Sequence, residues 1–392
     1  MKIIEKGYKI YLENNQKFNS VYLGVCFHQP LKADTAAKNR LLPLVMSESC
    51  KKYNSKIKLN KALAELGGAE LNIQAVKKGA EIILQFIVTA PQKNLTKCFE
   101  LLHDIIFEPL IIDNEFAVSK KEYLKKLIAD KVSDPKTYAL DRCIELMFEG
   151  KGFGTDADGK IEDVDNTGNL YEHYLYVINN SKTEIFVIGN TEENEVITYA
   201  EKYFCELKNS DINTENFVPC ELKTVKECAD TAQTRLCIGI DTGQGSRFEK
   251  MIYNEILGGE NSLLFKEIRE GKGLCYYIGS TYFSLANSIF IQAGIEEKDV
   301  EKVIEAIKAV IAEKNDEKML NSAKKALIDR LSGIDDMPLS LADFYITQSF
   351  FGDNISPETM SDELNKIQEI SLKPAVKMIY VLGGKNNESK NA

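Results

Sequence analysis

The chain has 392 residues, a formal net charge of −10, 44% hydrophobic residues and 28% charged residues. This length exceeds what a single hydrophobic core normally serves, so we expect a soluble globular protein with at least two domains. The acidic balance argues against binding to nucleic acid, which requires a basic surface, and no apolar run is long enough to span a membrane.

The N-terminal stretch MKIIEKGYKIYLENN lacks the apolar core and small-residue cleavage site of a secretion signal. We therefore expect the mature protein to begin near Met1 and to be cytoplasmic. The nine cysteines are odd in number and contain no C-x-x-C spacing. They are interpreted as reduced thiols that serve as small apolar residues, and no metal or other cofactor is expected.

Strand-like runs occur at four places along the chain. YKIYLEN (8–14), VYLGVCFHQ (21–29) and TEIFVIGN (183–190) are assigned to a first domain, and RLCIGID (235–241) begins a second. Residues 207–233, between them, are polar, contain Asn, Asp, Ser and Pro, and show no sustained apolar period. This composition is typical of a linker.

Two long segments follow the same order of elements. Residues 59–106 and 263–311 both predict a helix, a Gly-containing turn, two strands and a closing helix. The closing helices should bury one apolar face each. These faces comprise Leu95, Phe99, Leu102 and Ile106 in the first segment and Val300, Val303, Ile307 and Val310 in the second.

A second pair of segments repeats with nearly the same period. In residues 133–150 and 335–352, Asp and Pro open a helix and Gly closes it. The closing glycines are 202 residues apart (352 − 150) and the prolines 203 apart (338 − 135). The sequence therefore predicts two homologous α+β domains, residues 1–206 and 234–392, joined by the linker.

This layout resembles the insulinase/pitrilysin-like metallopeptidases, especially their two-domain members related to mitochondrial processing peptidase. The most specific stretch is ENSLLFKEIREGKGLCYYIGSTY (260–282), which is similar to the signature of the family's C-terminal domain. In that signature an Arg and a Tyr seven residues later help to hold the substrate backbone, and here they are Arg269 and Tyr276. The resemblance implies a clamshell of two domains, each an antiparallel sheet covered by helices.

Catalytic members of that family carry H-x-x-E-H, which places two His ligands and a water-activating Glu on one helix. In NRLLPLVMSESC (39–50), the resemblance places Arg40, Pro43 and Leu44 at those three positions, and no His occurs between residues 29 and 102. The later helix, SKKEYLKKLIADK, offers Lys125, Lys126 and Leu127 around the expected further Glu ligand.

The resemblance therefore implies a zinc-free, catalytically inactive member. The segment NRLLPLVMSES looks like the inactive partner of bacterial pairs associated with elongation factor P modification.

The remaining candidates have structural as well as functional interpretations. His28, His103 and His173 are each isolated in sequence, and a single His is usually a hydrogen-bonded core or surface residue. Gly258 and Gly259, in Gly-Gly-Glu-Asn, suit a turn and helix cap, while the resemblance also implies a backbone contact with substrate. The family places an edge strand of the first domain where an extended peptide can pair with it, which requires only backbone groups.

Three functions remain open. The first is a non-catalytic, peptide-binding subunit that completes the substrate chamber of an active insulinase-family zinc peptidase, as a heterodimer. The second is a stand-alone peptide-binding or scaffold protein, such as a homodimer without protease activity. The third is an enzyme of unrecognised chemistry. In each case the expected ligand is an unfolded or extended peptide.

Overall fold

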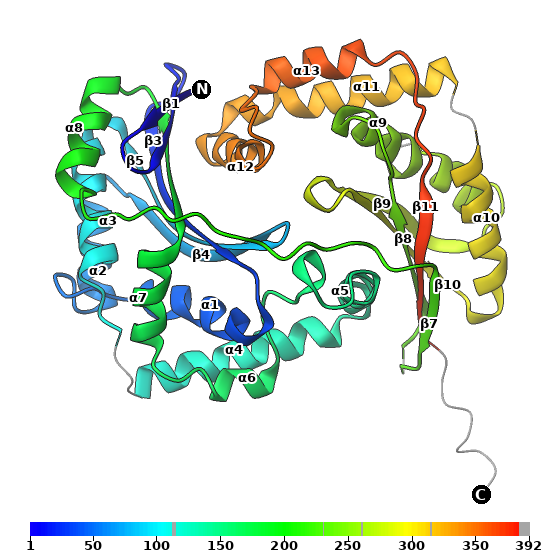
Figure 1. Cartoon of the computed structure of the whole chain (residues 1–392), viewed down its shortest axis with the longest axis horizontal. Helices are drawn as coiled ribbons and strands as arrows, with labels where there is room; N and C mark the ends of the chain where they lie inside the picture. Colours follow the sequence, from blue (N-terminus) through cyan, green and yellow to red (C-terminus); the bar gives the residue numbers. More distant parts are fainter. Residues whose placement is uncertain (112–114, 230, 260–261, 314–315, 384–392) are drawn as a thin grey trace, which may run out of the picture. The chain divides into compact units, whose positions relative to one another are not determined.

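The computed structural model describes residues 1–111, 115–229, 231–259, 262–313 and 316–383 (Figure 1). The chain divides into two compact units. The first unit comprises Met1–Ala129, Thr155–Glu215 and Gly333–Ser356. The second comprises Asp130–Gly154, Asn216–Ser332 and the chain from Pro357 onward.

The first unit is built on a six-stranded sheet in the order β1-β2-β6-β3-β5-β4. Neighbouring strands are antiparallel except β2 and β6, which run parallel. The central strand β3 is buried on both faces, which explains its continuous apolar sequence. The strands are β1 (Lys2–Glu5), β2 (Lys9–Asn14), β3 (Ser20–Pro30), β4 (Glu70–Lys78), β5 (Glu81–Pro91) and β6 (Lys182–Gly189).

Helices cover both faces of this sheet. The odd-numbered residues of β3, from Val21 to Phe27, share a core with α1, α3, α7 and α8. On the other face, α12 contacts β3 and β6. The helices of this unit are α1 (Ala33–Met46), α2 (Lys56–Glu65), α3 (Leu95–Phe107), α6 (Ile161–Asp165), α7 (Leu170–Asn180), α8 (Glu193–Tyr203) and α12 (Pro338–Ser349), and α4 (Glu115–Ser133) begins in it.

The second unit is built on a five-stranded sheet in the order β7-β11-β8-β10-β9. This order and its strand directions reproduce those of β2-β6-β3-β5-β4, including one parallel pair, β7 and β11. The strands are β7 (Lys223–Glu227), β8 (Thr234–Asp241), β9 (Cys275–Phe283), β10 (Ser288–Ile295) and β11 (Ala375–Leu382). Strand β7 lies inside the predicted linker. Its sequence, KTVKE, contains one apolar residue and therefore shows no hydrophobic period that would predict a strand.

The helices of the second unit pack in the same manner as those of the first. Helix α5 contacts β8 and β11, and α9 contacts β9. The helices are α5 (Pro135–Met147), α9 (Arg247–Gly258), α10 (Val300–Ala312), α11 (Glu317–Ser332), α13 (Pro357–Lys366) and a π-helix (Phe265–Glu270). Short 3₁₀ turns occupy Gln92–Asn94, Gly152–Gly154, Ser284–Ala286, Glu297–Asp299 and Ile334–Asp336.

The predicted α+β class with two helix-covered sheets is confirmed, and each sheet is mixed because of its single parallel pair. The repeat landmarks also fall in like elements. Pro135 and Pro338 both begin their helices, α5 and α12. Gly150 and Gly352 both have positive φ, 69° and 74°, just after those helices. All eight apolar residues predicted for the faces of the closing helices, now α3 and α10, are buried.

The compact units differ from the predicted domain limits by an exchange of equivalent helices. Helix α5 follows the first repeat in sequence but belongs to the second unit, and α12 follows the second repeat but belongs to the first unit. Among the described residues, no helix is both long and apolar enough to cross a membrane.

Candidate functional site

The segment predicted to hold the degenerate zinc motif lies in α1, and Arg40, the residue at the first predicted position, is a cation. Arg40 Nη1 donates a 2.8 Å hydrogen bond to the carbonyl oxygen of Ala75, on the edge strand β4. Its Nε lies 2.7 Å from Asp158 Oδ1. A guanidinium donates only and stays charged, so this position cannot serve as a metal ligand.

The other two motif positions are apolar. Pro43 is buried inside α1 and Leu44 is half-buried. Leu44 packs on an apolar cluster in which Leu41 of α1 meets Leu124 of α4. The contact between α1 and α4, the two helices predicted to hold the ligand positions, is therefore apolar.

The predicted third-ligand region is equally unsuited to zinc. Lys125, on α4, forms an ion pair of 2.8 Å with Asp165, and Lys126 and Leu127 are exposed. Throughout the described part of the chain, no group of three or more His, Cys, Asp or Glu side chains could hold a metal ion. The residues at this place do not fit the zinc that active relatives of such a fold would bind.

The second candidate site lies in the other unit. Arg269 is in the π-helix, a geometry that often marks functional positions. Its guanidinium lies 5.0 Å from the centre of the Phe265 ring, and it forms no ion pair with any residue that the structure describes. This exposed guanidinium keeps its donors available for a peptide carbonyl or carboxylate.

Tyr276 lies at the start of β9, the edge strand of the second sheet, and is 49% exposed. Its hydroxyl donates to Glu296 Oε1, and this bond raises the pKa of the phenol. The hydroxyl must leave Glu296 before it can donate to a peptide. The π-helix contacts β9, so Arg269 and Tyr276 stand on neighbouring elements of one unit.

Gly258 and Gly259 have a packing explanation. Gly258 ends α9 where that helix meets β9, and a Cβ on it would lie 2.0 Å from Ser280 Oγ and 2.3 Å from Ser280 N. A Cβ on Gly259 would lie 2.2 Å from Glu255 Oε1. Small residues are thus required for α9 to approach the edge strand. The other two residues of the predicted turn, 260 and 261, lie outside the described residues.

One titratable group with no local sequence signal is buried in the first sheet. His28 is completely buried, with Nδ1 2.8 Å from Glu81 Oε2 and Nε2 3.2 Å from Glu184 Oε2. Burial alone would lower the pKa of His28, but the two carboxylates raise it above its usual value. His28 is isolated in the sequence because its partners, Glu81 and Glu184, lie 53 and 156 positions later in the chain.

The other two histidines have ordinary surroundings. His173 Nε2 lies 2.8 Å from Asn39 Oδ1, and burial lowers its pKa to about 4, assisted by the charge of Lys38. His103 Nδ1 is 3.5 Å from the carboxylate of the adjacent Asp104. Neither histidine converges with the residues of the two candidate sites.

The chain is similar to known proteins over much of its length. Residues 166–327 match the family model described as "Peptidase M16 inactive domain". The chain is 27% identical over 323 residues to the "Probable inactive metalloprotease YmfF" of Bacillus subtilis (strain 168), covering 77% of this chain and 76% of that protein. It is 22% identical over 293 residues to an "Uncharacterized zinc protease" of Rickettsia felis, covering 70% of each.

Solved structures show the same fold. A conserved protein from Enterococcus faecalis V583 matches with a TM-score of 0.88 and 22% identity, over 97% of both chains. A peptidase M16 inactive domain from Pseudomonas fluorescens matches with a TM-score of 0.77 and 15% identity, over 98% of both chains. Residues 166–327 are thus similar to an M16 peptidase domain, and most of the chain is similar to a protein described as a probable inactive metalloprotease.

Proposed function

We propose that this chain is a non-catalytic, peptide-binding subunit that completes the substrate chamber of an active M16 zinc peptidase. One observation carries the proposal. Arg40, at the first ligand position, is bound to Asp158 and to the edge-strand carbonyl of Ala75. A chain that keeps the fold but holds a cation where zinc would bind retains the architecture of the family without its zinc-dependent hydrolysis.

Peptide binding is supported by the second unit. Arg269 has a guanidinium without an ion-pair partner in the described part of the chain, and Tyr276 presents a phenol on the edge strand β9. Both groups can bond a peptide backbone without any metal. An extended peptide could also pair with the edges of β4 or β9, because strand addition uses backbone groups alone.

The partner is proposed to be an M16 chain that carries an intact H-x-x-E-H motif. Bacterial pairs associated with elongation factor P modification are the group that the α1 sequence resembles. A chain of similar fold occurs in the solved "Complex III2" of Candida albicans, with a TM-score of 0.75 and 15% identity. That likeness supports the idea that this fold is used within larger assemblies.

The test is co-expression with candidate M16 chains that carry the motif, followed by size-exclusion chromatography and peptide hydrolysis. A 1:1 complex that cleaves an unstructured peptide faster than the candidate chain alone supports the proposal. The matched control destroys the candidate chain's own H-x-x-E-H motif, which should abolish cleavage without dissolving the complex. Failure of every candidate chain to bind would contradict the heterodimer.

The alternative is a stand-alone peptide-binding or scaffold protein. It is favoured by the two edge strands, β4 and β9, since both belong to this chain. It predicts that the purified chain, alone or as a homodimer, binds an extended peptide with no partner present. Fluorescence anisotropy with a labelled unstructured peptide distinguishes the two functions.

A further inference from the structure

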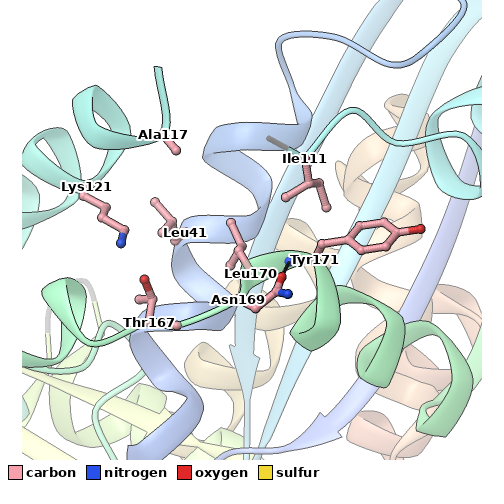
Figure 2. A pocket seen from close by; sticks show the side chains of 9 residues that line it. Leu41, Ile111, Ala117, Lys121, Thr167, Asn169, Leu170 and Tyr171 are labelled. Carbon is pink, nitrogen blue, oxygen red and sulfur yellow. Dashed lines mark hydrogen bonds between the residues drawn. The ribbon is translucent and has the colours of Figure 1, made fainter. Parts of the chain in front are cut away.

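A cavity of about 280 Å³ lies in the first unit, among α1, α4 and α7 (Figure 2). Its apolar wall is formed by Leu41, Ile111, Leu170 and Tyr171. Leu41 follows Arg40 on α1 but is completely buried among α1, α4 and α6 side chains. The cavity is therefore separate from the edge-strand contact that Arg40 makes.

Two polar groups from different elements converge in this cavity. Thr167 is only 1% exposed, and its hydroxyl has no hydrogen-bond partner among the residues that the structure describes. Lys121, on α4, forms no ion pair with those residues. Figure 2 shows the Thr167 hydroxyl and the Lys121 ammonium directed toward the same space. A buried hydroxyl without a partner costs stability, so its position is unexplained by packing alone.

The N-terminus of α7 adds to the positive character of this cavity. Asn169, which lines it, caps the helix by accepting from Tyr171 N and Glu172 N. The start of an 11-residue helix carries a partial positive charge that favours anions. A single lysine, a hydroxyl donor and a helix N-terminus suit a singly charged anion, whereas a phosphate dianion usually requires more cations or an arginine fork.

We propose that this cavity binds the carboxylate of a small ligand with an apolar body. The carboxylate accepts from Lys121 Nζ and from the Thr167 hydroxyl, and the carbon chain rests on Ile111 and Leu170. The volume suits one branched aliphatic residue or a short-chain acid, at the lower end of the range for ligand pockets. Two sources share this chemistry, namely the C-terminal residue of a peptide and a free aliphatic acid.

Isothermal titration calorimetry of the full chain with N-acetyl-leucine tests the proposal, with N-acetyl-leucinamide as the uncharged comparison. The amide should bind at least about tenfold more weakly, because a charge-assisted hydrogen bond is lost. Lys121→Met and Thr167→Val should each weaken N-acetyl-leucine binding by a similar factor. Lys126→Met, on the exposed face of the same helix, is the matched control and should leave affinity unchanged.

Thr167→Ser keeps the hydroxyl and should retain binding, which guards against a folding defect in the valine variant. Equal affinity for acid and amide, an equal loss in Lys126→Met, or no binding by the wild-type chain would each overturn the proposal. Titration with 4-methylpentanoate identifies the source. Binding of N-acetyl-leucine alone indicates a peptide C-terminus, and equal binding of both indicates a free acid. The assay uses the chain without a partner, so its outcome is independent of the proposed subunit role.

Discussion

Ser349, at the end of α12, donates a 3.1 Å hydrogen bond from its Oγ to Glu184 Oε2 on β6. The ring of the next residue, Phe350, lies 5.6 Å from the ring of His28. Glu184 is completely buried and also lies 2.6 Å from Lys182 Nζ. Helix α12, from late in the chain, thus contacts the first sheet through a buried network of charged groups.

This network predicts a pH dependence of stability. Because carboxylates raise the pKa of His28 in the folded state, its contribution is complete below its unfolded value of 6.5 and is lost as the pH rises through the folded pKa. Burial would raise the pKa of Glu184, but His28 and Lys182 lower it from 4.5 to about 2. Its contribution is present above 4.5 and is lost as the pH falls toward 2.

We therefore expect the contribution of His28 and Glu184 to the free energy of unfolding, measured with urea, to be greatest between pH 4.5 and pH 6.5. His28→Gln should lower it by about 3 kcal/mol at the optimum, since the buried Glu184 and the partly buried Glu81 lose their counter-charge. It should also flatten the decline above pH 6.5. His103→Gln, on α3, is the matched control, and an alkaline decline that persists unchanged in His28→Gln would contradict the assignment.

We expect the purified chain to bind no stoichiometric zinc. Arg40 places a permanent positive charge at the first predicted ligand position, and the side chains of Pro43 and Leu44 carry no ligand atoms. Inductively coupled plasma mass spectrometry after dialysis against a metal-free buffer measures the content directly. About one zinc per chain would refute the loss of the site.

Replacing Arg269 or Tyr276 should reduce peptide turnover by the reconstituted pair and leave assembly intact. Arg269→Ala removes a guanidinium that no ion pair holds in the described structure, so its effect on stability should stay below about 0.5 kcal/mol. Tyr276→Phe removes the hydroxyl that now donates to Glu296. A peptide that loses either contact loses the orientation required for cleavage.

Peptide turnover and thermal melting should be measured together for these variants. Lys272→Ala, an exposed cation in the following turn, provides the control for a general loss of charge. If turnover is unchanged in both Arg269→Ala and Tyr276→Phe, these residues have only a structural role.

Gly258→Ala should destabilise the second unit by about 1–3 kcal/mol, the usual cost of overpacking. The added methyl would meet the backbone nitrogen of Ser280, which cannot move without displacing β9. Gly279→Ala is the matched control, since its Cβ would lie 3.9 Å from Gly258 O, in ordinary van der Waals contact. Chemical denaturation measures both variants, and equal stability of the two would show that the close approach is not required.

The repeats and their helices could be predicted because their signals are local. Pro135 with Gly150, and Pro338 with Gly352, each bracket one helix within about 16 residues, and the apolar faces of α3 and α10 have helical spacing. Strand β7 could not be predicted, because its position depends on pairing with β11, some 150 residues later. Strand pairing through backbone groups alone produces no hydrophobic pattern in a polar sequence such as KTVKE.

The candidate sites also differ in whether their residues are adjacent in the sequence or come from separate elements. The prediction of a degenerate zinc motif depends on residues 40–44 of α1, which are adjacent in sequence. The network around His28 and the pair of Lys121 and Thr167 are assembled by tertiary structure from separate elements. Lysine and threonine are common surface residues. What distinguishes this pair is the burial of Thr167, whose hydroxyl has no hydrogen-bond partner within the described ranges of the chain.

The exchange of α5 and α12 makes the two halves of this protein mutually dependent. A cut between residues 207 and 222 would produce two fragments. The first fragment would keep α5, which packs on the second sheet, and would lack α12. The second fragment would keep α12, which packs on the first sheet, and would lack α5. Each fragment would expose apolar surface where that helix belongs, and only reassociation would cover it. The folding of either half therefore depends on a helix that the other half encodes.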